Sequence, residues 1–178
     1  MNRVKPVTVE QAPPAIKPIF DQLKQMMGRV PNIFLNMANS PSTINAFMTL
    51  NQLVEKTSLS PNLKTKLALV VSQANHCNYC LSAHSAIAKN MGLQEQDILQ
   101  ARKGEAEEKK ADAILKFAKS VVEKHGAVSD QEVANLKAQG VSDQEICEIV
   151  LVITLNTFSN FFNNVTNTEI DFPLAPKL

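Results

Sequence analysis

The feature of this 178-residue sequence that most constrains its fold is a regular set of helix start and stop signals. Ser60 precedes a proline, and Ser129 and Ser142 each open a Ser-Asp-Gln-Glu capping box, all of which are typical helix starts. Four of the five glycines follow a segment with helical periodicity, where glycine favours the left-handed conformation that ends a helix. These glycines are Gly92, Gly104, Gly126 and Gly140. Because no segment alternates polar and apolar residues as a strand does, the sequence predicts an all-α fold.

The spacing of apolar residues places the helices. Leu63, Leu67 and Val70 recur at intervals of three and four, which predicts a helix with one buried face. The range 143–165 has more apolar residues than one face needs, so we expect a central helix there. The prolines of the range 171–176 predict an extended tail that packs on the body or on a neighbour. Eight helices are predicted, at residues 13–27, 41–56, 61–75, 77–90, 94–101, 108–124, 130–138 and 143–165.

Composition and charge narrow the range of partners. Eighteen Lys and Arg against seventeen Asp and Glu leave a net charge of +1, which argues against nucleic acid or a membrane surface as a partner. The longest apolar runs, Leu67–Val71 and Ile149–Ile153, are far shorter than the roughly 20 residues of a membrane span. The chain opens without a basic and then apolar signal segment, so we expect a cytoplasmic protein.

The cysteines carry the chemistry. Three is an odd number, which disfavours a secreted disulfide framework, and two of them form the motif Cys77-Asn-Tyr-Cys80. In a reducing compartment such pairs are usually catalytic or metal-binding. If a helix begins near Cys77, then Cys77, Cys80 and His84 share one face, and the helix start favours a thiolate. The sequence therefore predicts a dithiol with His84 as an adjacent base.

Other interpretations of the motif remain open. A zinc site would use the two thiolates and the imidazole, but it needs a fourth ligand, for which the candidates are His76, His125 and Cys147. A c-type haem site is excluded because Leu81 stands where that site needs histidine. A thioredoxin-like site is disfavoured because the residues before the pair have a helical period. The pair could also be plain core packing. Cys147 lies among apolar residues, and we expect it to be buried in the core.

The run Leu59–His84, with its Cys-x-x-Cys-x-x-x-His motif, resembles the core of the alkylhydroperoxidase D-like proteins of the carboxymuconolactone decarboxylase superfamily. Val30–Phe34 and Asn167–Pro173 resemble the longer, peroxidase-related branch. The resemblance implies an all-helical fold that assembles as a dimer, trimer or hexamer. It also implies an antioxidant oxidoreductase that reduces organic hydroperoxides or hydrogen peroxide without a metal or other cofactor.

The same resemblance assigns the site. Cys77, Cys80 and His84 take the redox and proton-relay roles, and a Cys77–Cys80 disulfide is reset by an external dithiol reductant. Active relatives carry a glutamate twelve residues before the first cysteine, where this chain has Thr65, and some have histidine at the position of Tyr79. We take Thr65 and Tyr79 as candidate relay positions. Glu145 and Glu148 are candidates for the missing carboxylate.

The resemblance also suggests how a single domain of residues 1–178 is divided. A carboxymuconolactone decarboxylase-like core spans about 41–125, after an N-terminal extension at 1–40 and before the C-terminal helices and tail at 126–178. Two alternative functions remain. One is a weakly active or non-catalytic redox-sensitive assembly protein, and the other is a carboxymuconolactone decarboxylase-like enzyme.

Overall fold

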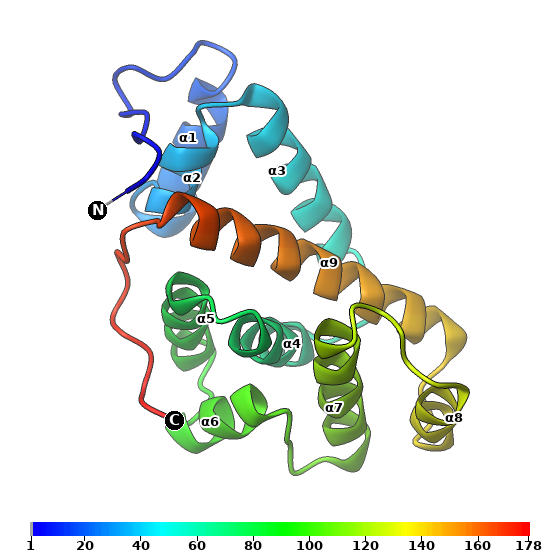
Figure 1. The fold of residues 1–178 in the computed structure, drawn as a ribbon. Coiled ribbons are helices and arrows are strands. Elements are labelled where there is room, and N and C mark those ends of the chain that lie inside the picture. Colours follow the sequence, from blue (N-terminus) through cyan, green and yellow to red (C-terminus); the bar gives the residue numbers. More distant parts are fainter. Residues whose placement is uncertain (1) are drawn as a thin grey trace.

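The computed structural model describes residues 2–178, and within this range it has nine helices and no strand (Figure 1). The fold is an all-α single domain, as predicted, and all eight predicted helices are confirmed to within four residues at either end. The helix missing from the prediction is α2, which is too short to display a repeat. The helices are α1 (Lys17–Met27), α2 (Asn32–Met37), α3 (Pro41–Glu55), α4 (Pro61–Ala74), α5 (Asn78–Asn90), α6 (Glu95–Lys103), α7 (Lys109–Glu123), α8 (Asp130–Ala138) and α9 (Asp143–Thr166).

The helix boundaries have the local causes that the sequence indicated. Ser60 caps α4 by accepting a hydrogen bond from the backbone N–H of Leu63. Ser129 and Ser142 form complete capping boxes at the starts of α8 and α9. At the end of α6, Gly104 adopts a positive φ of 86°, a conformation that costs residues with a Cβ atom more than glycine.

Helices α4 and α9 form the centre of the bundle. α4 packs against α5, α6, α7 and α9, and α9 also contacts α3, α5 and α7. Leu67, Val70, Ile149 and Val152 from these two helices are almost completely buried in the main core. By length and composition alone α9 could cross a membrane, but here it is packed among four other helices. The expectation of a central helix in this range is confirmed.

The prediction that Cys147 is buried is wrong. Cys147 is exposed on α9, on the same outward stripe as Val150, Phe161 and Val165, which are 45%, 55% and 68% exposed. Both sides of this helix carry apolar residues, so its periodicity does not reveal which side faces the core. The inward side is marked instead by the series Asn156, Asn160 and Asn163, since all three are buried.

A second apolar cluster lies at the other end of the bundle, where the first 40 residues and the C-terminal tail meet α5. It combines Phe20 and Met37 from the N-terminal helices with Tyr79, Cys77 and Cys80. The tail, drawn in red in Figure 1, descends beside α5 to α6. The predicted extended tail is thus confirmed, and it packs on the body of the protein.

Polar contacts hold the tail in place at three points, Asp171, Ala175 and Pro176. Arg29 and Asp171 form an ion pair. The backbone N–H of Ala175 donates to Ser82 Oγ at 3.2 Å. Arg102 donates to the Pro176 carbonyl. The tail is therefore fixed to the segment before α2, to α5, which carries the cysteine pair, and to α6.

Candidate functional site

The turn between α4 and α5 positions the cysteine pair. His76 adopts a positive φ of 53°, which reverses the chain, and the Cys77 N–H donates to the Ser72 carbonyl at 2.9 Å. Cys77 is thereby the N-cap of α5, and its Sγ accepts the backbone N–H of Cys80 at 3.2 Å. A thiol in this position replaces the usual Ser or Asp oxygen at the positive end of the helix, where negative charge is stabilised.

Cys77 and Cys80 are joined by a disulfide, with their Cα atoms 5.3 Å apart. Both are nearly inaccessible, at 0% and 3% exposure. They differ in what they face, because Cys80 lines a large cavity and Cys77 does not. A small molecule in this cavity would therefore meet the sulfur of Cys80 first.

The cavity beside Cys80 has a volume of about 720 Å³ and a mostly apolar wall. Its apolar residues come from α1, α2, α3, α5 and the tail, and they include three methionines. They are Leu23, Met26, Met27, Pro31, Ile33, Phe34, Phe47, Met48, Ala83, Ile87 and Phe172. The wall thus depends on residues from both ends of the chain, outside the core that the sequence analysis assigned to about 41–125.

His84 lies one turn after Cys80 on α5 and lines the same cavity, so the structure brings this pair together. The ring is only partly exposed, and its removal from bulk water lowers the pKa of His84 to about 4. Within residues 2–178, no hydrogen bond joins the imidazole to another group. At neutral pH the ring is therefore uncharged, and it can accept a proton but supplies no positive charge to a thiolate.

Asparagines of α9 contact the turn between α4 and α5 that carries the cysteine pair, which we call the cysteine turn. No motif in the sequence assigned these asparagines to the site. Asn160 accepts a hydrogen bond from Asn75 at 3.0 Å and donates to Ser72 at 3.1 Å. Asn163 donates through Nδ2 to Cys80 Sγ at 3.2 Å. Their spacing in the sequence follows one helix face, and that is the signal that could have revealed them.

The two candidate relay positions lie in different environments. The Thr65 hydroxyl is 3.3 Å from Met91 Sδ, and Thr65 does not line the cavity. Tyr79 does line it, and its hydroxyl accepts the Ile33 N–H at 3.2 Å. Burial raises the pKa of Tyr79 well above its usual range, and the charge of Asp171 adds to this effect. The Tyr79 hydroxyl therefore stays protonated at neutral pH.

The candidate carboxylates lie elsewhere. Glu145 pairs with Lys110 at 2.7 Å, and Glu148 accepts hydrogen bonds from Ser58. Neither lines the cavity. The carboxylate that does is Glu55, which ends α3 and pairs with Lys64 at 2.7 Å. No spacing in the sequence connects Glu55 with the cysteine pair.

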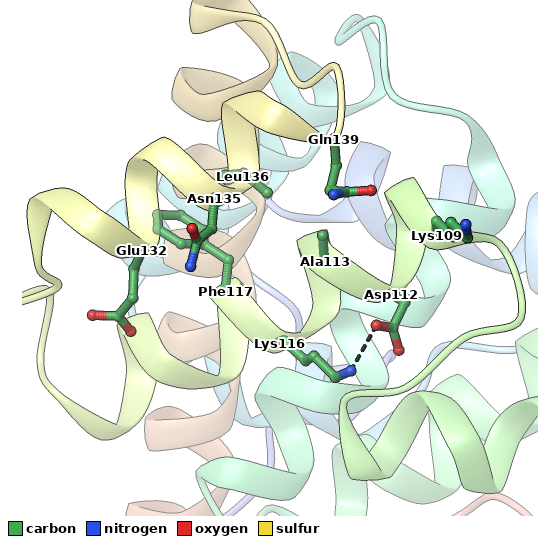
Figure 2. Close-up of a pocket in the computed structure, with 9 residues that line it drawn as sticks. All are labelled: Lys109, Asp112, Ala113, Lys116, Phe117, Glu132, Asn135, Leu136 and Gln139. Carbon is green, nitrogen blue, oxygen red and sulfur yellow. Dashed lines mark hydrogen bonds and ion pairs between the residues drawn. The ribbon is translucent and has the colours of Figure 1, made fainter.

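No group of three or more His, Cys, Asp or Glu side chains is placed to hold a metal ion in the part of the chain that the structure describes. Another cavity, of about 400 Å³, lies between α7 and α8 (Figure 2). None of its lining residues is Cys or His, and three of its four charged residues are paired. Lys116 binds Asp112 at 2.7 Å, and Glu132 is held by Lys124 at 2.8 Å. The dithiol cavity is therefore the stronger candidate site.

A helical bundle in which a Cys-x-x-Cys pair caps a helix beside an apolar cavity defines a class of helical dithiol proteins. Residues 41–123 match the carboxymuconolactone decarboxylase family. Over these residues the chain is similar to that family, and its fold is that of the alkylhydroperoxidase D-like proteins. A comparison with curated proteins finds no significant match.

Several solved structures share the fold over almost their whole length. A peroxidase-related protein with an alkylhydroperoxidase AhpD core, from Ralstonia eutropha JMP134, is 22% identical over 96% of this chain and 92% of its own, with a TM-score of 0.86. A peroxidase-related protein from Silicibacter sp. TM1040 is 22% identical over 95% and 94%, with a TM-score of 0.80. The debrominase Bmp8 is 25% identical over 95% and 92%, also with a TM-score of 0.80. A variant of Bmp8 has been crystallised with 2,3,4-tribromopyrrole.

Proposed function

We propose that this protein is a dithiol peroxidase that reduces organic hydroperoxides with Cys80 and Cys77. The observation that carries the proposal is the asymmetry of the pair, since the two sulfurs are bonded and only Cys80 faces the cavity. A peroxide reaching Cys80 would find its resolving partner already in bonding position behind it. The match of residues 41–123 to the carboxymuconolactone decarboxylase family and the fold shared with an alkylhydroperoxidase AhpD core support the same chemistry.

The reaction proceeds in two steps. Neutral His84 takes the proton of the Cys80 thiol, and the thiolate attacks the terminal oxygen of the hydroperoxide. The O–O bond breaks, Cys80 becomes a sulfenic acid, and the alkoxide leaves as an alcohol with the proton from His84. The Cys77 thiol then attacks the Cys80 sulfur, and water leaves as the disulfide forms. Two electrons from the thiols thus convert ROOH into ROH and water.

The cavity favours an organic hydroperoxide over hydrogen peroxide. Its wall is mostly apolar, and methionines such as Met26 and Met48 adapt to irregular apolar shapes. Burying an apolar substrate body there gains binding free energy that hydrogen peroxide cannot gain.

Resetting the pair needs an external dithiol. Because Cys77 is fully buried, a reductant protein would attack the Cys80 sulfur through the cavity. The cytoplasm, where thiol reductants are maintained, is the compartment that suits this cycle.

The outward stripe of α9 supports self-association. Val150, Phe161 and Val165 are exposed on one side of this helix, and exposed apolar stripes commonly mark interfaces. We place a homo-oligomeric contact here, in a dimer, trimer or hexamer. Sedimentation of the wild type and of Phe161→Glu tests it, because the charged variant should shift to a smaller species. A wild-type monomer at every concentration would rule it out.

The peroxidase test follows consumption of cumene hydroperoxide with dithiothreitol as the reductant. Cys80→Ser should lose turnover. Cys77→Ser, reduced beforehand and then treated with peroxide in the absence of dithiothreitol, should react once and retain Cys80 as a sulfenic acid, which mass spectrometry detects after dimedone trapping. Cys147→Ser is the matched control and should behave as the wild type. If neither Cys77→Ser nor Cys80→Ser alters peroxide consumption, the proposal is wrong.

A second candidate is reductive dehalogenation, favoured by the similarity to Bmp8 and by phenylalanine rings in the cavity wall. Two thiols would convert a C–Br bond into C–H, releasing bromide and a proton as the disulfide forms. Bromide release from 2,3,4-tribromopyrrole with dithiothreitol tests this reaction in the same variants. A non-catalytic assembly protein or a decarboxylase would use neither substrate, and stoichiometric zinc by elemental analysis would instead favour the metal interpretation.

A further inference from the structure

Each sulfur of the pair has its own hydrogen-bond donor. Cys77 Sγ accepts the backbone N–H of Cys80, as an N-cap does. Cys80 Sγ accepts Nδ2 of Asn163, which comes from the last turns of α9. The residues at both ends of this second contact are buried, at 3% exposure each. The donor to the cavity-facing sulfur therefore comes from a different helix and is shielded from water.

The rest of the Asn163 side chain makes no hydrogen bond that would give it a structural role. Its Oδ1 atom is buried without a hydrogen-bond partner. Asn160, one turn earlier, uses both its oxygen and its nitrogen to link α9 to the cysteine turn. Buried polar groups are normally satisfied, so an amide that leaves its oxygen unpaired and directs its N–H at a sulfur calls for a functional explanation.

A thiolate at Cys80 needs such a donor. The site is apolar and shielded, which disfavours a charged sulfur unless hydrogen bonds stabilise it. In the resting site His84 is neutral and becomes charged only when it takes the thiol proton, so it does not stabilise a thiolate that is already present. Glu55, which is the carboxylate of the cavity wall, pairs with Lys64 and would repel a thiolate rather than stabilise it. The N–H group of Asn163 therefore makes the favourable polar contact between the Cys80 sulfur and another helix.

We infer that Asn163 is a positioning residue that stabilises the Cys80 sulfur as a thiolate and so makes Cys80, rather than Cys77, the attacking cysteine. This inference rests on the proposed dithiol chemistry, and it assigns a role to a residue outside the Cys-x-x-Cys-x-x-x-His motif. It also explains why α9 has a further buried asparagine, Asn163, beside Cys80, although Asn160 already links α9 to the cysteine turn.

The test measures the acidity of Cys80 without any peroxide. In a Cys77→Ser, Cys147→Ser background Cys80 is the single thiol, and serine keeps the N-cap of α5. Its pKa is obtained from the pH dependence of iodoacetamide alkylation and from the ultraviolet absorbance of the thiolate. Two variants remove the hydrogen-bond donor, Asn163→Leu and Asn163→Ala. Both are used because the smaller alanine side chain fits the buried space even if leucine does not. Asn163→Asp places a negative charge beside the sulfur.

Removing the donor should raise the Cys80 pKa by roughly one to two pH units, and Asn163→Asp should raise it further. Asn164→Ala is the matched control, since Asn164 is exposed and donates to the Asn75 carbonyl instead. It should leave the pKa unchanged. Circular dichroism confirms that each variant is folded. An unchanged pKa in the folded donor-free variants overturns the inference.

The two proposals fail separately. If the wild type consumes no hydroperoxide but the Cys80 pKa depends on Asn163, the positioning role stands and the peroxidase function fails. If the wild type is an active peroxidase and the pKa does not depend on Asn163, only the positioning role fails. In an active wild type, Asn163→Leu should also shift the acidic limb of the pH–rate profile upward, which a loss of packing alone would not do.

Discussion

The ring of Phe172 packs edge-on against the ring of Tyr79, with 5.7 Å between their centroids and 86° between their planes. The guanidinium of Arg29 lies 4.7 Å from the centroid of the same Phe172 ring. Phe172, in the C-terminal tail, is therefore held between Arg29, which lies before α2, and Tyr79, which directly precedes Cys80. Because Phe172 also lines the dithiol cavity, the tail is part of the site.

Phe172→Ala should lower the free energy of unfolding by about 2 kcal/mol, since a half-buried aromatic ring loses its contacts. It should also raise KM for cumene hydroperoxide more than for hydrogen peroxide, because the cavity wall is opened. Urea denaturation and steady-state kinetics measure the two effects. Leu174→Ala is the control, as Leu174 is 77% exposed and should change neither. Equal effects of the two substitutions would contradict a role for the tail in the cavity.

Asn160→Ala should cost about 2 to 4 kcal/mol of stability, because it removes the hydrogen-bond donor to the buried Ser72 hydroxyl and one of the two acceptors of the Asn75 side chain. Asn164→Ala removes one exposed hydrogen bond and should cost less than about 1 kcal/mol. Chemical denaturation of the two variants decides the point. Similar losses would show that the buried asparagine does not hold α9 to the cysteine turn.

His84 should make the free energy of unfolding depend on pH at values above those at which carboxylates titrate. Its pKa is about 4 in the folded protein and 6.5 when unfolded. Between these values the unfolded chain takes up a proton that the folded protein does not, so stability falls as the pH is lowered. The ring is partly exposed to the cavity, so we expect a loss of about 1 to 2 kcal/mol between pH 7 and 5.

The control for this prediction is His84→Gln, in which the slope between pH 7 and 5 should flatten. Glu132 and Glu145 have pKa values lowered by their lysine and serine partners. Their stabilising contributions are complete above about 4.5 and are lost only at lower pH. A slope that persists in the glutamine variant would assign it to groups other than His84.

Cys147 should react with a thiol reagent in the native, oxidised protein, because it is an exposed free cysteine while the other two form a disulfide. Ellman's reagent should therefore titrate one thiol before reduction and three after reduction and unfolding. Cys147→Ser should lower each count by one. Because this side of α9 is also the proposed interface between copies of the chain, the native count is repeated with Phe161→Glu. If that variant has no reactive thiol either, the position of Cys147 on the outward side of α9 is contradicted.

The fold could be predicted from the sequence largely because its signals are local. Ser129 and Ser142 specify where helices begin through contacts within four residues, and they do so in the structure. The burial of Cys147 could not be predicted in this way. It depends on which side of an apolar helix meets α3, α4, α5 and α7, and that choice is made by tertiary packing.

The candidate site likewise has a part that local sequence signals predict and a part that only tertiary packing brings together. Cys77, Cys80 and His84 lie within eight consecutive residues, so their relationship follows from one helix start. Asn163 reaches Cys80 from 83 residues away, and Glu55 reaches the cavity from another helix. Contacts of this kind have no fixed spacing in the sequence. For Asn163 the one signal in the sequence is the repeat of asparagines on one face of α9, and for Glu55 there is none.

The place of Phe172 in the cavity wall affects the order of events during protein synthesis. The ribosome completes the cysteine pair more than 80 residues before it adds Asn163 and Phe172. A growing chain that ends before them has its thiols but lacks both the donor to Cys80 and the last part of the wall. The nascent protein therefore acquires a complete site only after Phe172 has been added, and termination before that residue yields a chain with an uncovered cysteine pair.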